Sequence, residues 1–121
     1  MFKNNNVTQQ KTYAFAIRIV NLYRYMCKEQ YEYILSKQLL RSGTAVGAIV
    51  SEGVHAQSRA DFLNKMNVAL KEAQESEFWI RLLHDTDYLT DEMFESIHED
   101  CVEIVKLLTS IVKTLKDSMG K

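Results

Sequence analysis

Proline is absent from all 121 residues of the chain, and this absence restricts the fold more than any other feature. Proline removes a backbone donor and interrupts a helix, so a chain without it favours long, unbroken helices. A length of 121 residues is enough for one hydrophobic core but not for two. The sequence therefore predicts a single, largely helical domain over residues 1–121.

Four segments have helical periodicity, and short turns separate them. We expect helices over residues 8–28, 32–52, 58–85 and 91–118, with Ser58 and Thr90 as N-caps and Gly53 closing the second helix. Helices of similar length joined by short loops predict an all-α, antiparallel up-down-up-down four-helix bundle. Apolar spacing predicts the buried lines Leu35, Leu39, Val46, Ile49 and Val50; Phe62, Met66, Ala69, Leu70, Ala73 and Ile80; and Phe94, Ile97, Cys101, Ile104, Leu108, Ile111 and Leu115.

The first helix is too apolar for a helix that has one face in water. Between Tyr13 and Met26, eleven of fourteen residues are apolar or aromatic, and the exceptions are Arg18, Asn21 and Arg24. A helix that is apolar almost all round must be covered on most sides. We therefore expect this helix to meet another subunit.

Two of the four glycines, Gly43 and Gly47, lie four residues apart inside the second predicted helix. Each interior glycine costs a helix about 1 kcal/mol relative to alanine. Small residues at this spacing let another helix approach closely, and the added packing offsets the penalty. Arg41 and Glu52 in the same helix exclude a membrane span.

Charge is divided unevenly along the chain. Residues 1–59 carry a net charge of +5 and residues 60–121 a net charge of −6. Such a division indicates either nucleic-acid contacts by the basic half or two complementary protein surfaces. The candidate nucleic-acid contacts are Lys3, Lys11, Arg18, Arg24, Lys28 and Lys37.

Catalytic and metal-binding patterns are weak. Glu-x-x-His occurs as Glu52…His55 and as Glu95…His98, but an up-down bundle places these pairs at opposite ends, about 30 Å apart. A zinc site could also be drawn from His84, Asp85, Asp87 and His98. No serine or cysteine is evidently paired with a histidine, so we expect no catalytic residue, metal or cofactor.

The context expected for the chain is the cytoplasm. Cys27 and Cys101 lack CxxC spacing and are expected to be buried free thiols in a reducing compartment. The start has no apolar run typical of a signal peptide, and no membrane or small-molecule partner is evident.

Two blocks, "QLLRSGTAVGAIVSEG" and "SRADFLNKMNVALKEAQESEFWIRLL", closely resemble the bacterial four-helix bundle family encoded in intervening sequences of 23S ribosomal RNA. The blocks cover Gln38 to Leu83. Ala45 stands where the family often has serine, and Ile49 where it often has asparagine, so any polar role of these positions is absent here.

The resemblance implies a homopentameric ring and kinship with the accessory variability determinant of diversity-generating retroelements, which binds a reverse transcriptase and nucleic acid. Arg41, Glu72 and Glu75 match charged positions of the family motif. We interpret them, together with Glu52, as structural ion pairs within or between subunits, with Arg41 as a nucleic-acid contact in the alternative. Trp79 is expected to be a core or interface anchor.

The expected function is a non-enzymatic, oligomeric binding or scaffold protein associated with ribosomal RNA or another nucleoprotein. Two alternatives remain: an accessory nucleic-acid-binding factor for a reverse transcriptase, and a metal-dependent bundle enzyme.

Overall fold

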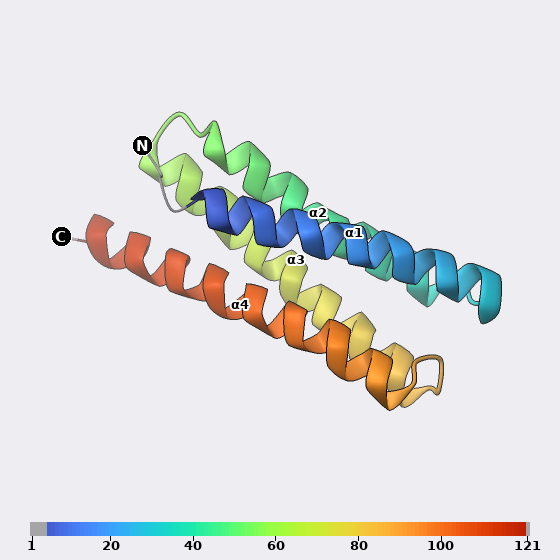
Figure 1. Ribbon diagram of the computed structural model, residues 1–121. Coiled ribbons are helices and arrows are strands. Elements are labelled where there is room, and N and C mark those ends of the chain that lie inside the picture. Colours follow the sequence, from blue (N-terminus) through green and yellow to red (C-terminus); the bar gives the residue numbers. More distant parts are fainter. Residues whose placement is uncertain (1–4, 121) are drawn as a thin grey trace.

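Four long α-helices form the molecule in a computed structural model that describes residues 5–120 (Figure 1). They are α1 (Asn5–Glu29), α2 (Leu35–Val54), α3 (Arg59–Asp85) and α4 (Asp91–Met119). Each helix packs against the next along the chain, and α4 returns beside α1. The predicted all-α up-down bundle is confirmed.

The apolar spacing of the sequence identified most of the core. Buried side chains from every helix meet along the bundle axis, among them Phe15, Val46, Met66 and Leu108. The predicted line of α4 differs at two points, since Phe94 is half-buried and Val112 is buried in place of the half-buried Ile111. In the other two predicted lines, Leu35, Ile49 and Leu70 are half-buried and pack against the core. The core is continuous from one end of the bundle to the other.

The two glycines of α2 bring α1 and α2 into close contact. A Cβ built on Gly43 would lie 2.8 Å from Ile19 Cγ1, and one built on Gly47 would lie 3.1 Å from the backbone oxygen of Thr12. The helix that approaches is therefore α1 of the same chain, so these glycines serve the fold of one subunit.

The second helix begins and ends later than its sequence pattern predicts. It starts at Leu35, and the Glu32 carboxylate accepts hydrogen bonds from the backbone N–H groups of Ile34, Leu35 and Ser36 at 3.0, 2.9 and 2.8 Å. The expected C-terminal role of Gly53 is wrong: the helix continues to Val54, and no glycine within residues 5–120 has a positive φ. A glycine outside the left-handed region gives no signal for helix termination.

The remaining helix boundaries lie close to the predicted ones. α1 already begins at Asn5, three residues before the expected start. Ser58 Oγ accepts from the Asp61 N–H at 3.0 Å, and Thr90 Oγ1 accepts from the Met93 N–H at 3.1 Å, so both predicted caps are confirmed.

Packing between α1 and α4 is looser than between the other neighbouring helices. Figure 1 shows α4 diverging from α1, with the two chain ends at the same end of the bundle. Polar contacts and an open cavity lie in this seam between α1 and α4.

Candidate functional site

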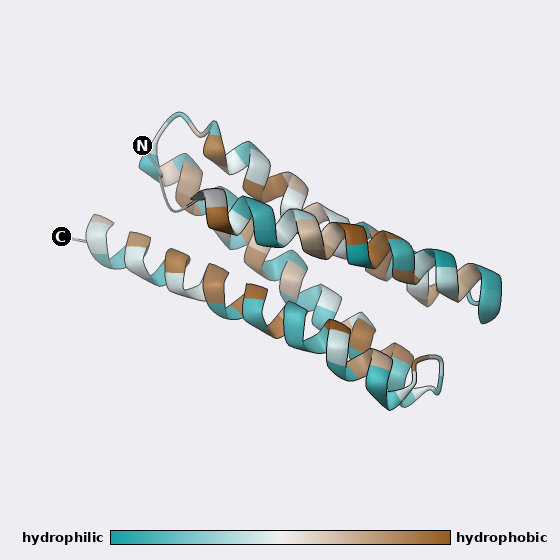
Figure 2. Ribbon diagram, viewed as in Figure 1, coloured by the Kyte–Doolittle hydropathy of each residue, from teal (hydrophilic) through white to brown (hydrophobic). Residues whose placement is uncertain are grey.

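The outward side of α1 is an apolar surface that its own subunit leaves uncovered. Tyr13 is 69% exposed and Ile17 is 49% exposed, and Val20 beside them is half-buried. Figure 2 shows the apolar middle of α1 as a brown stretch of the ribbon. Together with Ala16 these residues form the α1 patch, which surrounds an open hollow of about 250 Å³.

Ion pairs within the chain neutralise two of the predicted nucleic-acid contacts. Lys11 Nζ lies 3.1 Å from Glu103 Oε1, and the Arg18 guanidinium pairs with Asp100. Arg18 also donates to the Ser96 side chain at 2.7 Å and to the Ser96 carbonyl oxygen at 3.2 Å. These two cations fasten α1 to α4, so they are poor candidates for binding phosphate.

Three other predicted contacts, Arg24, Lys28 and Lys37, form no ion pair within residues 5–120. They lie on or near the end of α1 and the start of α2, where Tyr31 and Tyr33 in the turn are exposed. Lys3 lies outside the described residues. The basic half of the chain thus presents its unpaired charge mainly around the α1–α2 turn.

Arg41 joins α2 to α3 through two carboxylates. Its guanidinium pairs with Glu72 at 3.3 Å and with Glu75, and Glu75 also accepts from the Trp79 indole N–H at 3.0 Å. Hydrogen bonds from Trp79 and Arg41 lower the pKa of Glu75, and hydrogen bonds to Glu75 and Glu72 raise the pKa of Arg41. All four predicted residues therefore belong to one polar network on the outside of the α2–α3 pair.

Beneath this network, α2 and α3 are joined by a buried hydrogen bond between Ser42 Oγ and Ser76 Oγ, 2.9 Å long. Sequence patterns did not single out either serine. Glu52, the remaining predicted ion-pair residue, contacts Lys65 at 3.2 Å.

The two histidines considered for zinc are held apart by an aromatic ring. Phe94 stacks between His84 and His98, with ring centroids 4.1 and 4.8 Å away. His84 contacts Asp91 at 2.7 Å, and that hydrogen bond raises its pKa; His98 contacts Glu77 at 2.9 Å. Among the described side chains, no three His, Cys, Asp or Glu residues are grouped as metal ligands would be.

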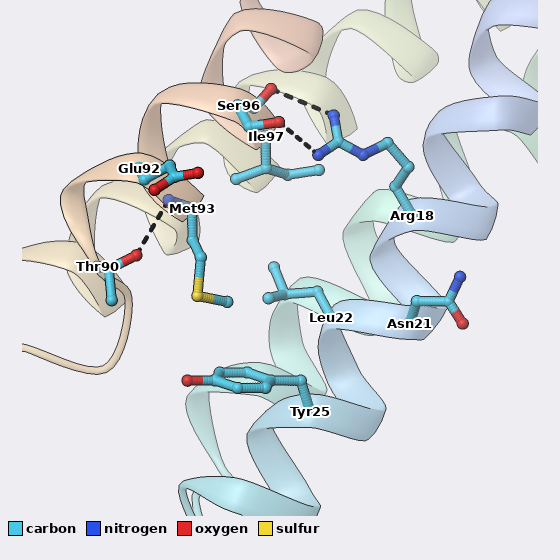
Figure 3. Close-up of a pocket in the computed structure, with 9 residues that line it drawn as sticks. All are labelled: Arg18, Asn21, Leu22, Tyr25, Thr90, Glu92, Met93, Ser96 and Ile97. Carbon is cyan, nitrogen blue, oxygen red and sulfur yellow. Dashed lines mark hydrogen bonds between the residues drawn. The ribbon is translucent and has the colours of Figure 1, made fainter.

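An open cavity of about 600 Å³ lies in the α1–α4 seam (Figure 3). Its apolar wall comes from Leu22 and Tyr25 of α1 and from Met93 and Ile97 of α4. Figure 3 shows the Arg18 guanidinium at its edge, turned toward Ser96. The polar group best placed to bind a ligand is therefore already occupied by α4.

The two cysteines differ in burial. Both are free thiols, and Cys101 is buried as expected, but the predicted burial of Cys27 is wrong, since it is half-buried. Burial raises the pKa of Cys101 to about 12, so its thiol stays protonated at neutral pH.

None of the helices within residues 5–120 combines the length and apolarity needed to cross a membrane.

Comparisons with known proteins point to one family. Residues 4–110 match the family described as 23S rRNA-intervening sequence protein. The chain is similar, at 56% identity and a TM-score of 0.88, to a crystal structure from Bacteroides thetaiotaomicron described as a protein with unknown function from the S23 ribosomal protein family. That similarity covers 90% of this chain and 97% of the other. No protein with curated annotation matches.

Proposed function

Because the chain belongs to the 23S rRNA-intervening sequence protein family, we propose that it is a non-enzymatic scaffold that works as a ring of identical subunits. The observation that carries this proposal is the α1 patch. Exposed apolar side chains along one helix of a small domain mark a surface that a partner covers. A ring needs two different surfaces on each subunit, and it closes when the rotation between neighbours returns to the start.

A binding role is supported better than catalysis by the chemistry of the described residues. The titratable groups that come together do so in pairs or short networks that link helices, such as Arg18 with Asp100 and Arg41 with Glu72 and Glu75. Such contacts stabilise an arrangement of helices and leave no general base beside a nucleophile. Free thiols also fit a cytoplasmic protein.

The ring is tested by the mass of the protein in solution. We expect a homopentamer of about 70 kDa, five times the 14.0 kDa chain, by light scattering after size-exclusion chromatography at micromolar concentration. A particle of 14.0 kDa at this concentration would contradict the proposal.

A second candidate, association with RNA as a ribosomal or reverse-transcriptase accessory factor, is favoured by the α1–α2 turn. Here Lys37 lies near the exposed Tyr31 and Tyr33, and single-stranded nucleic acid is bound by cations together with aromatic faces. A ring would repeat this turn around one rim, so that weak contacts add up.

We expect the triple variant Tyr31→Ala, Tyr33→Ala, Lys37→Ala to lose most of the binding to a single-stranded RNA column at about 50 mM salt, because stacking alone contributes about 1–3 kcal/mol per base. Lys11→Ala is the matched control and should bind as the wild type does, since Lys11 is engaged by Glu103. Absence of wild-type binding at this salt concentration would exclude the RNA role and leave the scaffold role standing.

A further inference from the structure

Exposed apolar side chains also occur on α3, on the side of the bundle opposite to the α1 patch. Phe78 is 56% exposed and Val68 is 38% exposed. Phe78 lies between Glu75, which contacts α2, and Glu77, which contacts α4, so it points away from the bundle. Its ring meets the Trp79 ring edge-on, with centroids 5.0 Å apart. We call Val68 and Phe78 the α3 ridge.

The α1 patch and the α3 ridge are on diagonally opposed helices. Both α1 and α3 pack against α2 and α4, and within the described residues they do not pack against each other. Their outward faces therefore lie on opposite sides of the subunit, and a ring closes if each copy is rotated about the bundle axis relative to the one before it. Two such faces on one subunit are what a head-to-tail contact between sister copies requires.

The two surfaces also lie at matching heights along the bundle. Ser42 of α2 bonds to Ser76 of α3, and the adjacent Gly43 contacts Ile19 of α1, so Ile19 and Ser76 are level. Both helices run toward the same end of the bundle, with a rise of about 1.5 Å per residue.

Counting residues from this level places the α3 ridge and the α1 patch at nearly the same height along the bundle. Phe78 comes two residues after Ser76, and Val20 comes one residue after Ile19, a difference in height of about 1.5 Å. Val68 comes eight residues before Ser76, about 3 Å from the height of Tyr13. A sister copy standing alongside in the same orientation thus brings Phe78 to the hollow of the α1 patch.

The hollow is large enough for the ring of Phe78. Its volume is about 250 Å³, whereas a buried cavity of about 150 Å³ accommodates benzene. Its lining is apolar at Tyr13, Ala16, Ile17 and Val20 and polar at Asn21 and Arg24.

Charges near the ends of the same helices are complementary. Asp85 comes nine residues after Ser76, and Lys28 comes nine residues after Ile19, so the two side chains lie at the same height. Both are exposed, and Lys28 has no ion pair among the residues described, while Asp85 lies 3.3 Å from His84 Nδ1. Arg81, the nearest basic residue of α3, is turned about 60° toward α4 relative to Phe78.

We propose that the α3 ridge of one copy inserts into the α1 patch of the next, with Phe78 in the hollow and Asp85 beside Lys28. This inference rests on the proposed ring and names the two faces that form it. The occupant of the α1 patch is a second copy of this chain.

Two disabled variants, mixed together, test this arrangement. Ile17→Asp destroys the patch but keeps the ridge, and Phe78→Asp destroys the ridge but keeps the patch. We expect each alone to be a folded monomer of 14.0 kDa, because every junction then lacks one partner. An equimolar mixture has one intact junction and should give a dimer of about 28 kDa and nothing larger.

A variant outside both surfaces and a measurement of folding serve as controls. Met119→Asp introduces the same charge at an exposed apolar position in the last turn of α4, and it should assemble as the wild type does. Circular dichroism melts establish that each variant is folded, and Val68→Asp provides a second ridge variant if Phe78→Asp is not.

The outcomes separate this inference from the ring itself. A wild-type monomer would overturn both proposals. An assembled wild type whose ridge variants remain fully assembled would overturn the assignment of these faces and leave the ring. Persistent self-association of Phe78→Asp with loss of assembly in Ile17→Asp would show that two α1 patches pair with each other instead.

Discussion

Replacing Gly43 with alanine is expected to lower the free energy of unfolding by about 2 kcal/mol, although alanine is the better helix former. The new Cβ would lie 2.8 and 2.9 Å from the two γ carbons of Ile19, a β-branched side chain that is fully buried. Such a side chain has one preferred rotamer in a helix, so α1 itself must move. Overpacking of this kind costs typically about 1–3 kcal/mol and outweighs the gain in helix propensity.

Gly53 provides the matched control, because the same substitution should there be neutral or stabilising. Its Cβ would lie 2.6 Å from Met66 Cε, the end of a flexible side chain that can rotate away. Thermal melts at one fixed protein concentration compare the two, since association shifts apparent stability. A loss of roughly 6–10 °C is expected for Gly43→Ala. Equal stability of both variants would show that α1 can shift without cost.

Replacing Glu32 with alanine is expected to lower the free energy of unfolding by about 2–3 kcal/mol. Its carboxylate is the acceptor for three N–H groups at the start of α2, and Glu32 itself is only 8% exposed. The substitution would leave these donors without a charged acceptor and expose them to incomplete hydration. The neighbouring Glu29→Ala, at an exposed position, should change stability by less than about 0.5 kcal/mol.

The contribution of Glu32 should also depend on pH. Burial acts to raise the pKa of Glu32, but the N–H groups of Leu35, Ser36 and Ile34 outweigh it, and the pKa is lowered. A carboxyl whose pKa is lower in the folded state stabilises above its unfolded pKa of about 4.3, and the effect is lost as the pH falls further. Denaturant unfolding of wild type and Glu32→Gln should therefore differ fully near neutral pH and converge in acid. A difference that stays constant down to about pH 2 would contradict this assignment.

The bundle could be predicted because the patterns that define its helices are local in the sequence. The absence of proline, the caps Ser58 and Thr90, and apolar spacing in α3 and α4 all act within one helix. The glycine spacing correctly indicated a close helix approach, but not which helix approaches. Gly43 and Gly47 contact α1 of the same subunit, and the proposed assembly surface is elsewhere.

Contacts between distant residues could not be read from the sequence. Lys11 and Arg18 looked like free cations because their partners, Glu103 and Asp100, are about ninety and eighty positions away. Glu32 was assigned to the second helix because a carboxylate just before a helix resembles one in its first turn. Its backbone partners become apparent only when Tyr31 adopts a φ of 53° and turns the chain into α2.

Of the two candidate surfaces, one could be predicted from the sequence and the other could not. The excess of apolar residues on α1 predicted a covered face, and the exposed Tyr13 and Ile17 are part of it. Phe78 was not predicted from the sequence, since an isolated apolar residue on an otherwise polar helix face is common. Its significance depends on the height of α3 relative to α1, which only the contacts of α2 with both helices define.

The order in which the helices pack has a consequence for how the chain reaches its native state. Most long-range contacts join helices that are consecutive in the sequence, and the one closure between the first and last helices is sparse. A topology of this kind needs little loop closure before contacts form, so it belongs to the class that folds within microseconds to milliseconds. In the proposed ring, each subunit would therefore fold before it meets its neighbours, and assembly, which depends on concentration, would be the slow step.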